Sequence, residues 1–345
     1  MRALFYGLGG IGQRHLRLFR ELQPDAEIGA VRVKNRQFEI NDSLAADNCV
    51  DLTQKYDIKT FPSTKQALDF RPDIAIVANP TSAHVTTALE LLAHGIPVFV
   101  EKPLSHSMSG VNKLLRLSKD NNVPLFVGYM MRFHPAAIKL KELIEKKVVG
   151  KIYNVHVAIN SYFPNWHPYE SYTDLYAASK VLGGGVVLTE IHEIDLLCWY
   201  FGAPSRVASM GGTLSQLDID VEDTASILMQ NSFDSYPFFT TIQMSFVQKH
   251  LLRELTIQGE HGYLRWDIST GKINLSNHYN KLNKEWGYAD VERNDLFRSQ
   301  LRHIIDSIQN GSNVERGHDA IVTTQLTAMG IHRSLESGQF EKIPS

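Results

Sequence analysis

A run of closely spaced glycines near the N-terminus constrains the fold of this chain more than any other feature. Gly7, Gly9 and Gly12 have the spacing G-x-G-x-x-G, between the apolar segment 3–6 and residues 11–22, where apolar side chains recur at helical spacing. Between a strand and a helix, this spacing predicts a loop for the pyrophosphate of a dinucleotide, because Gly9 lets the backbone approach the phosphates. A glycine-rich turn without a ligand is the less favoured alternative. The expected cofactor contacts are Gly7, Gly9, Gly10, Ile11 and Gly12.

Short apolar segments alternate with segments of helical periodicity up to about residue 128. The predicted strands are 27–33, 73–78, 97–100 and 125–127, and the predicted helices between them are 83–93 and 107–121. Strands that alternate with helices predict a parallel sheet with right-handed crossovers. Residues 1–128 are therefore predicted to form a Rossmann domain, a doubly wound parallel sheet that binds the dinucleotide.

The pattern changes after residue 128. A predicted helix at 135–147 precedes longer segments in which apolar and polar residues alternate. The predicted strands are 151–162, 225–230, 238–246 and 253–258, and two helices are predicted at 295–309 and 318–337. Such alternation predicts an antiparallel sheet with one solvent-facing side. The fold class is thus α/β, with a C-terminal α+β domain over 129–345 whose large, open-faced, mostly antiparallel sheet serves substrate binding and oligomerisation.

Composition excludes several classes of function. The formal net charge of the 345 residues is -2, which is not the basic excess of a nucleic-acid-binding protein. The two cysteines, Cys49 and Cys198, have no zinc-ligand spacing, and residues 192–195 are not an H-E-x-x-H motif, so no metal is predicted. Neither a signal-peptide core nor an apolar segment long enough for a bilayer is seen. We expect a cytoplasmic protein without membrane or nucleic-acid partners.

The residues after the second predicted strand bear on the choice of cofactor. An acidic residue at this place usually holds the adenosine ribose of NAD, but residues 30–36 contain none. Arg32, Lys34 and Arg36 could instead pair with a 2′-phosphate, so NADP is favoured over NAD. The alternative is a solvated basic loop.

Several further motifs follow in a fixed order along the chain. They are Arg14-His15 after the glycines, Ala78-Asn79-Pro80-Thr81-Ser82-Ala83-His84, Glu101-Lys102-Pro103, the segment from Gly128 to Pro135, and the segment from Gly183 to Asp195. Together with the phosphate loop, they resemble the Gfo/Idh/MocA family of oxidoreductases over nearly the whole chain. The resemblance implies that Lys102 contacts both nicotinamide and substrate and that His192 is the acid/base. The residues implied to contact the cofactor are Asn79, Pro80, Thr81, His84, Glu101 and Lys102.

One departure from the family pattern concerns the segment before His192. The family usually has an aspartate three or four residues before this histidine, where Thr189 and Leu188 stand here. Glu190 is close in sequence, but we expect it to face elsewhere, because neighbouring helix residues lie about 100° apart. The missing carboxylate leaves an alternative from another class open, a catalytically weak or inactive regulatory protein that retains the cofactor site.

The main prediction is an NAD(P)-dependent dehydrogenase that acts on the CH–OH group of a sugar, a cyclitol or a derivative such as a nucleotide or amino sugar. His192 suits proton transfer because the reference pKa of histidine lies near neutrality, and such a base contributes about 10²–10⁴-fold to the rate. Lys102 can polarise the same hydroxyl and stabilise the developing alkoxide. The alternative for His192 is a helix histidine that bonds a backbone carbonyl.

The segments 164–167 and 172–176 form an aromatic, hydroxyl-rich loop before the glycine run. Such side chains suit a sugar ring, although an oligomer contact or a core patch is equally favoured by composition. Tyr176 and Lys180 also match the Tyr-x-x-x-Lys of short-chain dehydrogenases, whose glycine spacing is absent here. An open sheet face needs a cover, so a homodimer or homotetramer is expected. The expected substrate contacts are Lys102, Arg132, Trp166, Tyr176, Lys180, Thr189 and His192.

Overall fold

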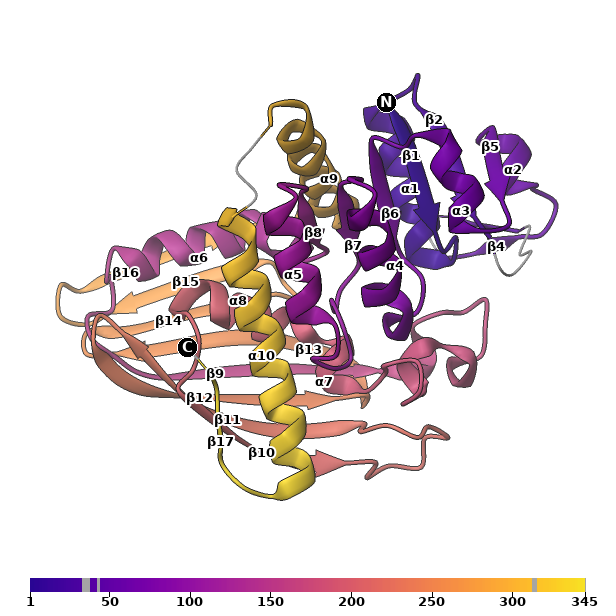
Figure 1. Cartoon of the computed structure of the whole chain (residues 1–345). Helices are drawn as coiled ribbons and strands as arrows, with labels where there is room; N and C mark the ends of the chain where they lie inside the picture. Colours follow the sequence, from indigo (N-terminus) through magenta and orange to yellow (C-terminus); the bar gives the residue numbers. More distant parts are fainter. Residues whose placement is uncertain (33–37, 42–43, 312–314, 345) are drawn as a thin grey trace.

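Two sheets of different construction organise the molecule. The computed structural model describes residues 1–32, 38–41, 44–311 and 315–344. Figure 1 shows the N-terminal sheet with its helices on one side of the molecule and the longer second sheet on the other. This arrangement confirms the predicted fold class.

The N-terminal sheet is entirely parallel. Its strands are β1 (Arg2–Tyr6), β2 (Glu27–Val31), β5 (Ile58–Phe61), β6 (Ile74–Val77), β7 (Val98–Val100) and β8 (Leu125–Val127). They are ordered β5-β2-β1-β6-β7-β8, so the direction of winding reverses between β1 and β6. Ligands of doubly wound sheets bind at the carboxyl ends of the strands beside such a switch point.

Helices flank the parallel strands, and short elements fill the connections. The helices are α1 (Gly10–Leu22), α2 (Leu52–Lys55), α3 (Thr64–Ala67), η1 (Leu68–Phe70), α4 (Thr81–Ala93) and α5 (Val111–Asp120); β3 (Glu39–Ile40) pairs with β4 (Ala46–Asp47). All four residues of β6 are fully buried, as its continuous apolar sequence predicts. The sequence did not predict β5, because this edge strand exposes Lys59 and Thr60 and has no apolar run.

The second sheet has nine strands in the order β16-β15-β14-β13-β9-β12-β11-β10-β17. All neighbouring pairs are antiparallel except β9 with β12. The strands are β9 (Ile152–Tyr162), β10 (Arg206–Gly212), β11 (Thr224–Phe233), β12 (Tyr236–Ser245), β13 (Val247–Gly259), β14 (Gly262–Asp267), β15 (Lys272–Asn277), β16 (Leu282–Gly287) and β17 (Glu341–Lys342).

Helices cover only one face of this sheet. The helical elements after β8 are η2 (Met130–Phe133), α6 (Pro135–Glu145), η3 (Phe163–Asn165), η4 (Tyr172–Asp174), η5 (Tyr176–Ala178), α7 (Val186–Thr189), α8 (Ile191–Phe201), α9 (Arg293–Gln309) and α10 (Glu315–Ser337). Figure 1 shows α6, α8 and α10 lying over the same face of the sheet. On the opposite face, the aligned side chains of His156, Thr241 and Phe239 are exposed, as the alternation predicts.

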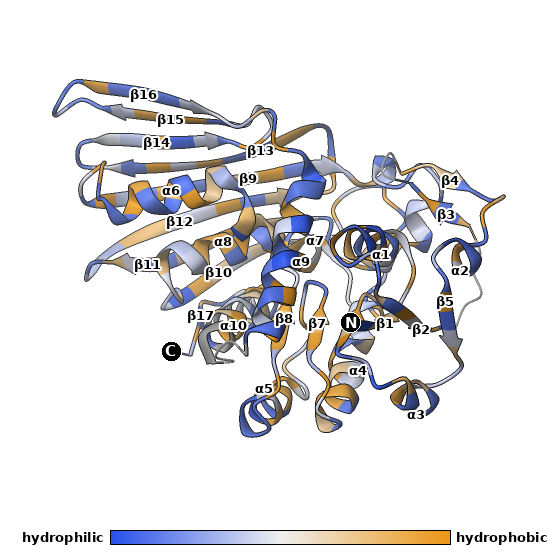
Figure 2. Cartoon of the chain, turned by 90° about the horizontal axis from the view of Figure 1, so that it is seen from above, coloured by the Kyte–Doolittle hydropathy of each residue, from blue (hydrophilic) through white to orange (hydrophobic). Residues whose placement is uncertain are grey.

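Helix α9 returns to the first sheet and packs against α1 and η2 (Figure 2). The Phe297 ring lies 5.5 Å from the His15 ring, and the Arg298 guanidinium lies 3.0 Å from the Glu21 carboxylate. Gln300 on the same helix donates to the Val127 carbonyl at the end of β8. Contacts with α1 thus hold the start of α9, at Arg293, beside the N-terminal sheet.

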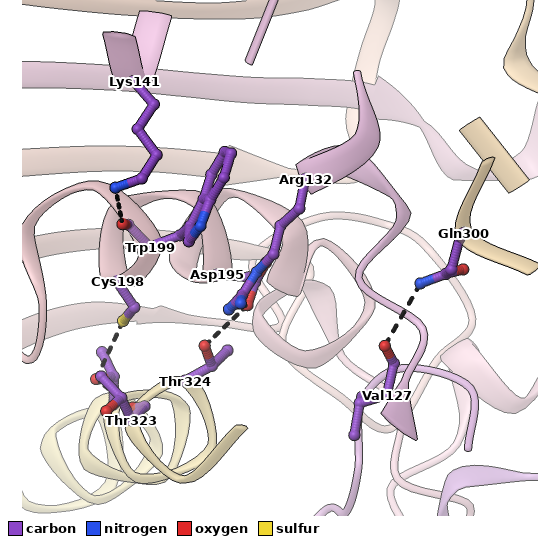
Figure 3. A network of polar contacts seen from close by, with 10 residues as sticks. Val127, Arg132, Lys141, Asp195, Cys198, Trp199, Gln300, Thr323 and Thr324 are labelled. Atoms are coloured by element: carbon purple, nitrogen blue, oxygen red, sulfur yellow. Dashed lines mark hydrogen bonds and ion pairs between the residues drawn. The ribbon is translucent and has the colours of Figure 1, made fainter. Parts of the chain in front are cut away.

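A buried ion pair and one further hydrogen bond join η2, α8 and α10 on the helix-covered side of the second sheet. Arg132 of η2 donates two hydrogen bonds, of 2.8 and 2.6 Å, to the fully buried Asp195 of α8 (Figure 3). Thr324 of α10 donates a third, of 2.9 Å, to the same carboxylate. Breaking such a buried pair from one side costs about 3–5 kcal/mol. Arg132 therefore has a structural role beside its predicted contact with substrate.

Candidate active site

The phosphate loop has the geometry that its glycines predict. Gly7 has a φ of +87°, and a Cβ on it would lie 2.5 Å from the Ala78 carbonyl oxygen. A Cβ on Gly12 would overlap the Gly7 carbonyl, so strand and helix approach as closely as the motif requires. The position of a Cβ on Gly9 is open, with no other atom within 4 Å. No side chain caps the start of α1 at Gly10, and no acidic residue lies in its first turn. The loop can therefore receive an anion on its backbone amides.

The turns after β6 and β7 are held together by His84. Its two ring nitrogens lie 2.8 Å from the carbonyl oxygens of Asn79 and Pro103, one in each turn. The Asn79 amide donates to Thr87, but its Oδ1 is buried and has no hydrogen-bond partner among the described residues. Burial lowers the pKa of His84, so this histidine positions the two turns as a neutral ring.

Lys102 reaches from the first sheet to the second domain. Its Nζ donates a 2.6 Å hydrogen bond to the main-chain carbonyl of Thr189. The preceding Glu101 is buried and accepts from the Lys102 backbone amide and from His15 of α1, whose Nε2 lies 2.6 Å away. Although desolvation acts to raise it, the pKa of Glu101 lies below its ordinary value because of His15. The Glu101 carboxylate thus fixes the backbone of Lys102.

The glycine run positions the histidine helix against the N-terminal sheet. A Cβ on Gly183 would lie 2.9 Å from the Cβ of Thr81, at the start of α4. Gly185 has a φ of +100°, and the Glu222 carboxylate occupies the place where its Cβ would stand. Glu222 accepts from the Val187 backbone amide at 3.1 Å and so caps α7. Only glycine permits both close approaches.

The helix that carries His192 is interrupted at Glu190. Helix α7 ends at Thr189 and α8 begins at Ile191, and Glu190 between them has a ψ of +32°. The helical rotation of about 100° on which the prediction for Glu190 was based therefore does not apply at this residue. Leu188 and Thr189, the two candidates for the family's aspartate position, are both buried, and the Thr189 carbonyl rather than a carboxylate contacts Lys102.

His192 lies in an electropositive environment. The residue is only 6% exposed, and its Nδ1 is buried with no hydrogen-bond partner in the described part of the chain. Desolvation, followed by the charges of Lys102, Arg253 and Arg293, holds the pKa of His192 well below 6.5. The imidazole is therefore neutral at neutral pH and can accept a proton. The Lys102 ammonium, bonded to the carbonyl of Thr189 three residues before His192, is one of the charges that lower this pKa.

Three charged residues near His192, namely Arg253, Arg293 and Glu193, were not among the site residues expected from the sequence. Arg253 of β13 donates through Nε to Glu193, at 2.6 Å. Desolvation, with the neighbouring Glu190 as a further cause, raises the pKa of Glu193, although Arg253 opposes this. Arg293 begins α9. Its position could have been noticed, because a cation at a helix N-terminus opposes the helix dipole; Arg253 has no such local signal.

The aromatic loop lies against both the second domain and the phosphate loop. Trp166 packs edge-on against Phe163 and Phe246, and its indole N–H donates to Ser161. Tyr169, which the sequence did not indicate, places its hydroxyl 2.6 Å from where a Cβ on Gly10 would stand. The loop thus begins in the core of the second domain and reaches the predicted pyrophosphate site.

The remaining predicted residues have different surroundings. Tyr176 is half-buried and packs against the core, and Lys180 is exposed, with its backbone amide bonded to Asp220. Arg32 lies half-buried directly after β2, whereas Lys34 and Arg36 fall outside the described residues. In the described ranges, no three His, Cys, Asp or Glu side chains gather as metal ligands, and none of the helices is long and apolar enough for a membrane span.

Two family profiles match the chain. The profile described as an oxidoreductase family with an NAD-binding Rossmann fold matches residues 1–129, and that of the GFO/IDH/MocA C-terminal domain matches residues 137–265. The chain therefore belongs to the Gfo/Idh/MocA family, and it is an NAD(P)-dependent oxidoreductase. The resemblance that the motifs indicated is confirmed.

Individual relatives have low sequence identity to this chain. An uncharacterized oxidoreductase of Streptococcus pneumoniae is 26% identical over 72% of this chain and 67% of its own length. An inositol 2-dehydrogenase/D-chiro-inositol 3-dehydrogenase of Shouchella clausii is 29% identical over 56% of this chain and 51% of its own. The crystal structure of GenD2 from gentamicin A biosynthesis, in complex with NAD, superposes with a TM-score of 0.81 at 21% identity, over 100% of this chain and 97% of that one.

A pair of alanine substitutions separates cofactor binding from folding at the phosphate loop. Gly9→Ala adds a methyl group in open space at a φ of -78°, which any residue adopts, so unfolding in urea is expected to be unchanged. The same methyl group would obstruct the pyrophosphate, and NADH affinity by fluorescence titration is expected to fall at least about tenfold. Gly12→Ala is the control, and both stability and affinity are expected to fall. Unchanged NADH affinity in Gly9→Ala would contradict this assignment.

Proposed function

We propose that the protein transfers a hydride between the CH–OH carbon of a sugar, a cyclitol or a sugar derivative and a nicotinamide dinucleotide. The observation that carries the proposal is the hydrogen bond from Lys102 to the Thr189 carbonyl, three residues before His192. It brings the lysine at the end of β7 next to the histidine of α8. Similarity to an inositol dehydrogenase supports a polyhydroxylated substrate.

The turns at the carboxyl ends of β1, β6 and β7 carry residues that fit a dinucleotide. Open space beside Gly9 and the uncapped start of α1 suit the pyrophosphate. The Oδ1 of Asn79, which has no partner among the residues that the structure describes, can accept a hydrogen bond from the bound molecule. Pro80, Thr81 and Glu101 complete the two turns. When bound, a nicotinamide ring supplies the hydride acceptor.

His192 and Lys102 have different roles at the hydroxyl group of the substrate. In the direction of oxidation, neutral His192 would accept the proton of the substrate hydroxyl. The hydride would pass from the hydroxyl-bearing carbon to the nicotinamide, and the C–O bond would become a carbonyl. Lys102 donates a hydrogen bond to the oxygen and stabilises its developing negative charge. The Thr189 carbonyl orients the lysine, which is the positioning that a carboxylate would otherwise provide.

Substitutions at these two residues test the roles. His192→Asn and Lys102→Met are each expected to lower kcat for sugar oxidation by about 10²–10⁴-fold with NADH affinity retained. Because the pKa of His192 is lowered, the acid limb of the pH profile of kcat/KM is expected below pH 6.5 and to be lost in His192→Asn. Stopped assays over pH 5–9 with a panel of sugars and cyclitols measure this.

Three outcomes separate the alternatives. Unchanged turnover in both variants would overturn the mechanism. Firm NADH binding without turnover of any polyol or sugar derivative would favour a regulatory protein that retains the cofactor site, the class left open by Leu188 and Thr189. An acid limb of the kcat/KM profile near pH 6.5 or higher would contradict a His192 pKa that is lowered by desolvation.

We further propose a preference for NADP over NAD, based on Arg32 directly after β2. Arg32 can pair with a 2′-phosphate, and Lys34 can add a second cation. Arg32→Asp is expected to weaken NADPH binding at least about tenfold and to leave NADH binding unchanged or stronger. Lys113→Asp, with the same charge change on the exposed side of α5, is the control. Tighter binding of NADH by the unaltered protein, with no response to Arg32→Asp, would reverse the preference.

Finally, we propose that the open face of the second sheet pairs with a second copy, in a homodimer or a homotetramer. Phe239 and Tyr263 are 51% and 42% exposed on this face, beside the bonded pair His156 and Thr241. Light scattering at micromolar concentration is expected to give a multiple of 39.0 kDa. Thr241→Arg should lower the mass, whereas Ser109→Arg on the other domain should not. A monomeric mass of the unaltered protein would refute the proposal.

A further inference from the structure

A loop of the second domain lies at the start of α1. A Cβ on Gly10, the first residue of this helix, would stand 2.6 Å from the hydroxyl oxygen of Tyr169. Helical Cα–Cβ bonds tilt toward the N-terminus of the helix, so the hydroxyl lies at the end where the first backbone amides have no partner within the helix. The neighbouring position of a Cβ on Gly9 is open. The Tyr169 hydroxyl therefore borders the space proposed for the pyrophosphate.

The hydrogen bonds around His167 determine the direction of the Tyr169 hydroxyl. The Nδ1 of His167 lies 3.1 Å from a carboxylate oxygen of Glu170 and 3.2 Å from the Tyr169 hydroxyl oxygen. Because an ionised carboxylate only accepts hydrogen bonds, Nδ1 carries the proton that it shares with both oxygens. The Tyr169 oxygen is thus the acceptor in this contact, and its hydroxyl hydrogen points away from His167.

Packing holds the loop in this position. The rings of His167 and Tyr169 are stacked, with their centres 5.1 Å apart and an angle of 18° between their planes. Trp166, the residue before His167, packs edge-on against Phe163 and Phe246 in the core of the second domain. A hydroxyl that is positioned in advance loses little conformational entropy when it binds a ligand, which favours affinity.

We propose that Tyr169 binds the pyrophosphate of the coenzyme by donating a hydrogen bond from its hydroxyl group to a phosphate oxygen. The inference rests on the proposed function and adds the second domain to the coenzyme site. The start of α1 and the loop contact the same anion, so the bound coenzyme connects the two domains. Because a hydrogen bond to a charged group is stronger than one between neutral groups, its loss is expected to weaken binding about tenfold or more.

Tyr169→Phe tests the proposal, because it removes only the hydroxyl group and keeps the ring that stacks on His167. The Kd values of NADH and NADPH, from fluorescence titration of the full-length protein, are expected to rise about tenfold or more. ADP-ribose carries the pyrophosphate without the nicotinamide, and calorimetry should show the same loss for it. Tyr279→Phe is the matched control, since it makes the same change at a side chain that is 78% exposed between β15 and β16. It should leave all three Kd values unchanged.

Gly10→Ala tests the same contact from the side of α1. Its methyl group would collide with the hydroxyl oxygen of Tyr169 but would lie 3.8 Å from the ring carbon Cζ, which is an ordinary contact. The methyl group thus displaces the hydroxyl and is expected to weaken NADH binding by about the factor found for Tyr169→Phe. Because both changes remove one contact, the double variant should bind NADH about as weakly as either single variant.

The outcomes separate this proposal from the proposed function. Unchanged Kd values in Tyr169→Phe would overturn the proposal and leave the proposed function intact. Weaker binding of NADH with unchanged binding of ADP-ribose would also overturn it, because the hydroxyl would then act on the nicotinamide half. Losses that multiply in the double variant would contradict the shared contact, and with it the proposal. Failure of the unaltered protein to bind NADH or NADPH would overturn the proposed function itself.

Discussion

The hydrogen bond from Lys102 to the Thr189 carbonyl is the contact on which the candidate site depends, because it connects the N-terminal domain to the second domain beside His192. Each end is fixed separately. Glu101 and His15 anchor the lysine from the parallel sheet, and the close approach of Gly183 to Thr81 brings α7 to the start of α4. A side chain at Gly183 would separate the partners. The chemistry of the site therefore rests on backbone proximity as much as on the reactive side chains.

Burial determines how the charges near this contact behave. Desolvation lowers the pKa of His192, so that its ring is neutral at neutral pH, and raises the pKa of Glu193. Elsewhere the protein compensates buried charge internally, as Arg132 and Thr324 do for Asp195. Such a satisfied buried pair maintains the fold.

Local sequence signals predicted most of the N-terminal sheet and the main strands of the second one. The apolar run of β6 and the helical spacing of α1 are properties of neighbouring residues, and both elements formed as predicted. Edge strand β5 was missed because solvent on one side removes the apolar signal. The break at Glu190 was missed because residues 186–201 contain neither proline nor glycine, the residues that usually signal a helix end.

The sequence by itself determined the glycine loop, the alternation of strands and helices, and the candidate pair Lys102 and His192, since each depends on residue type and short-range spacing. Only the tertiary structure decided that the Thr189 carbonyl holds the lysine, that Arg132 is occupied by Asp195, and that Arg253 pairs with Glu193. These contacts join residues 60 to 87 positions apart. Chain topology and packing select such partners, and no local pattern encodes them.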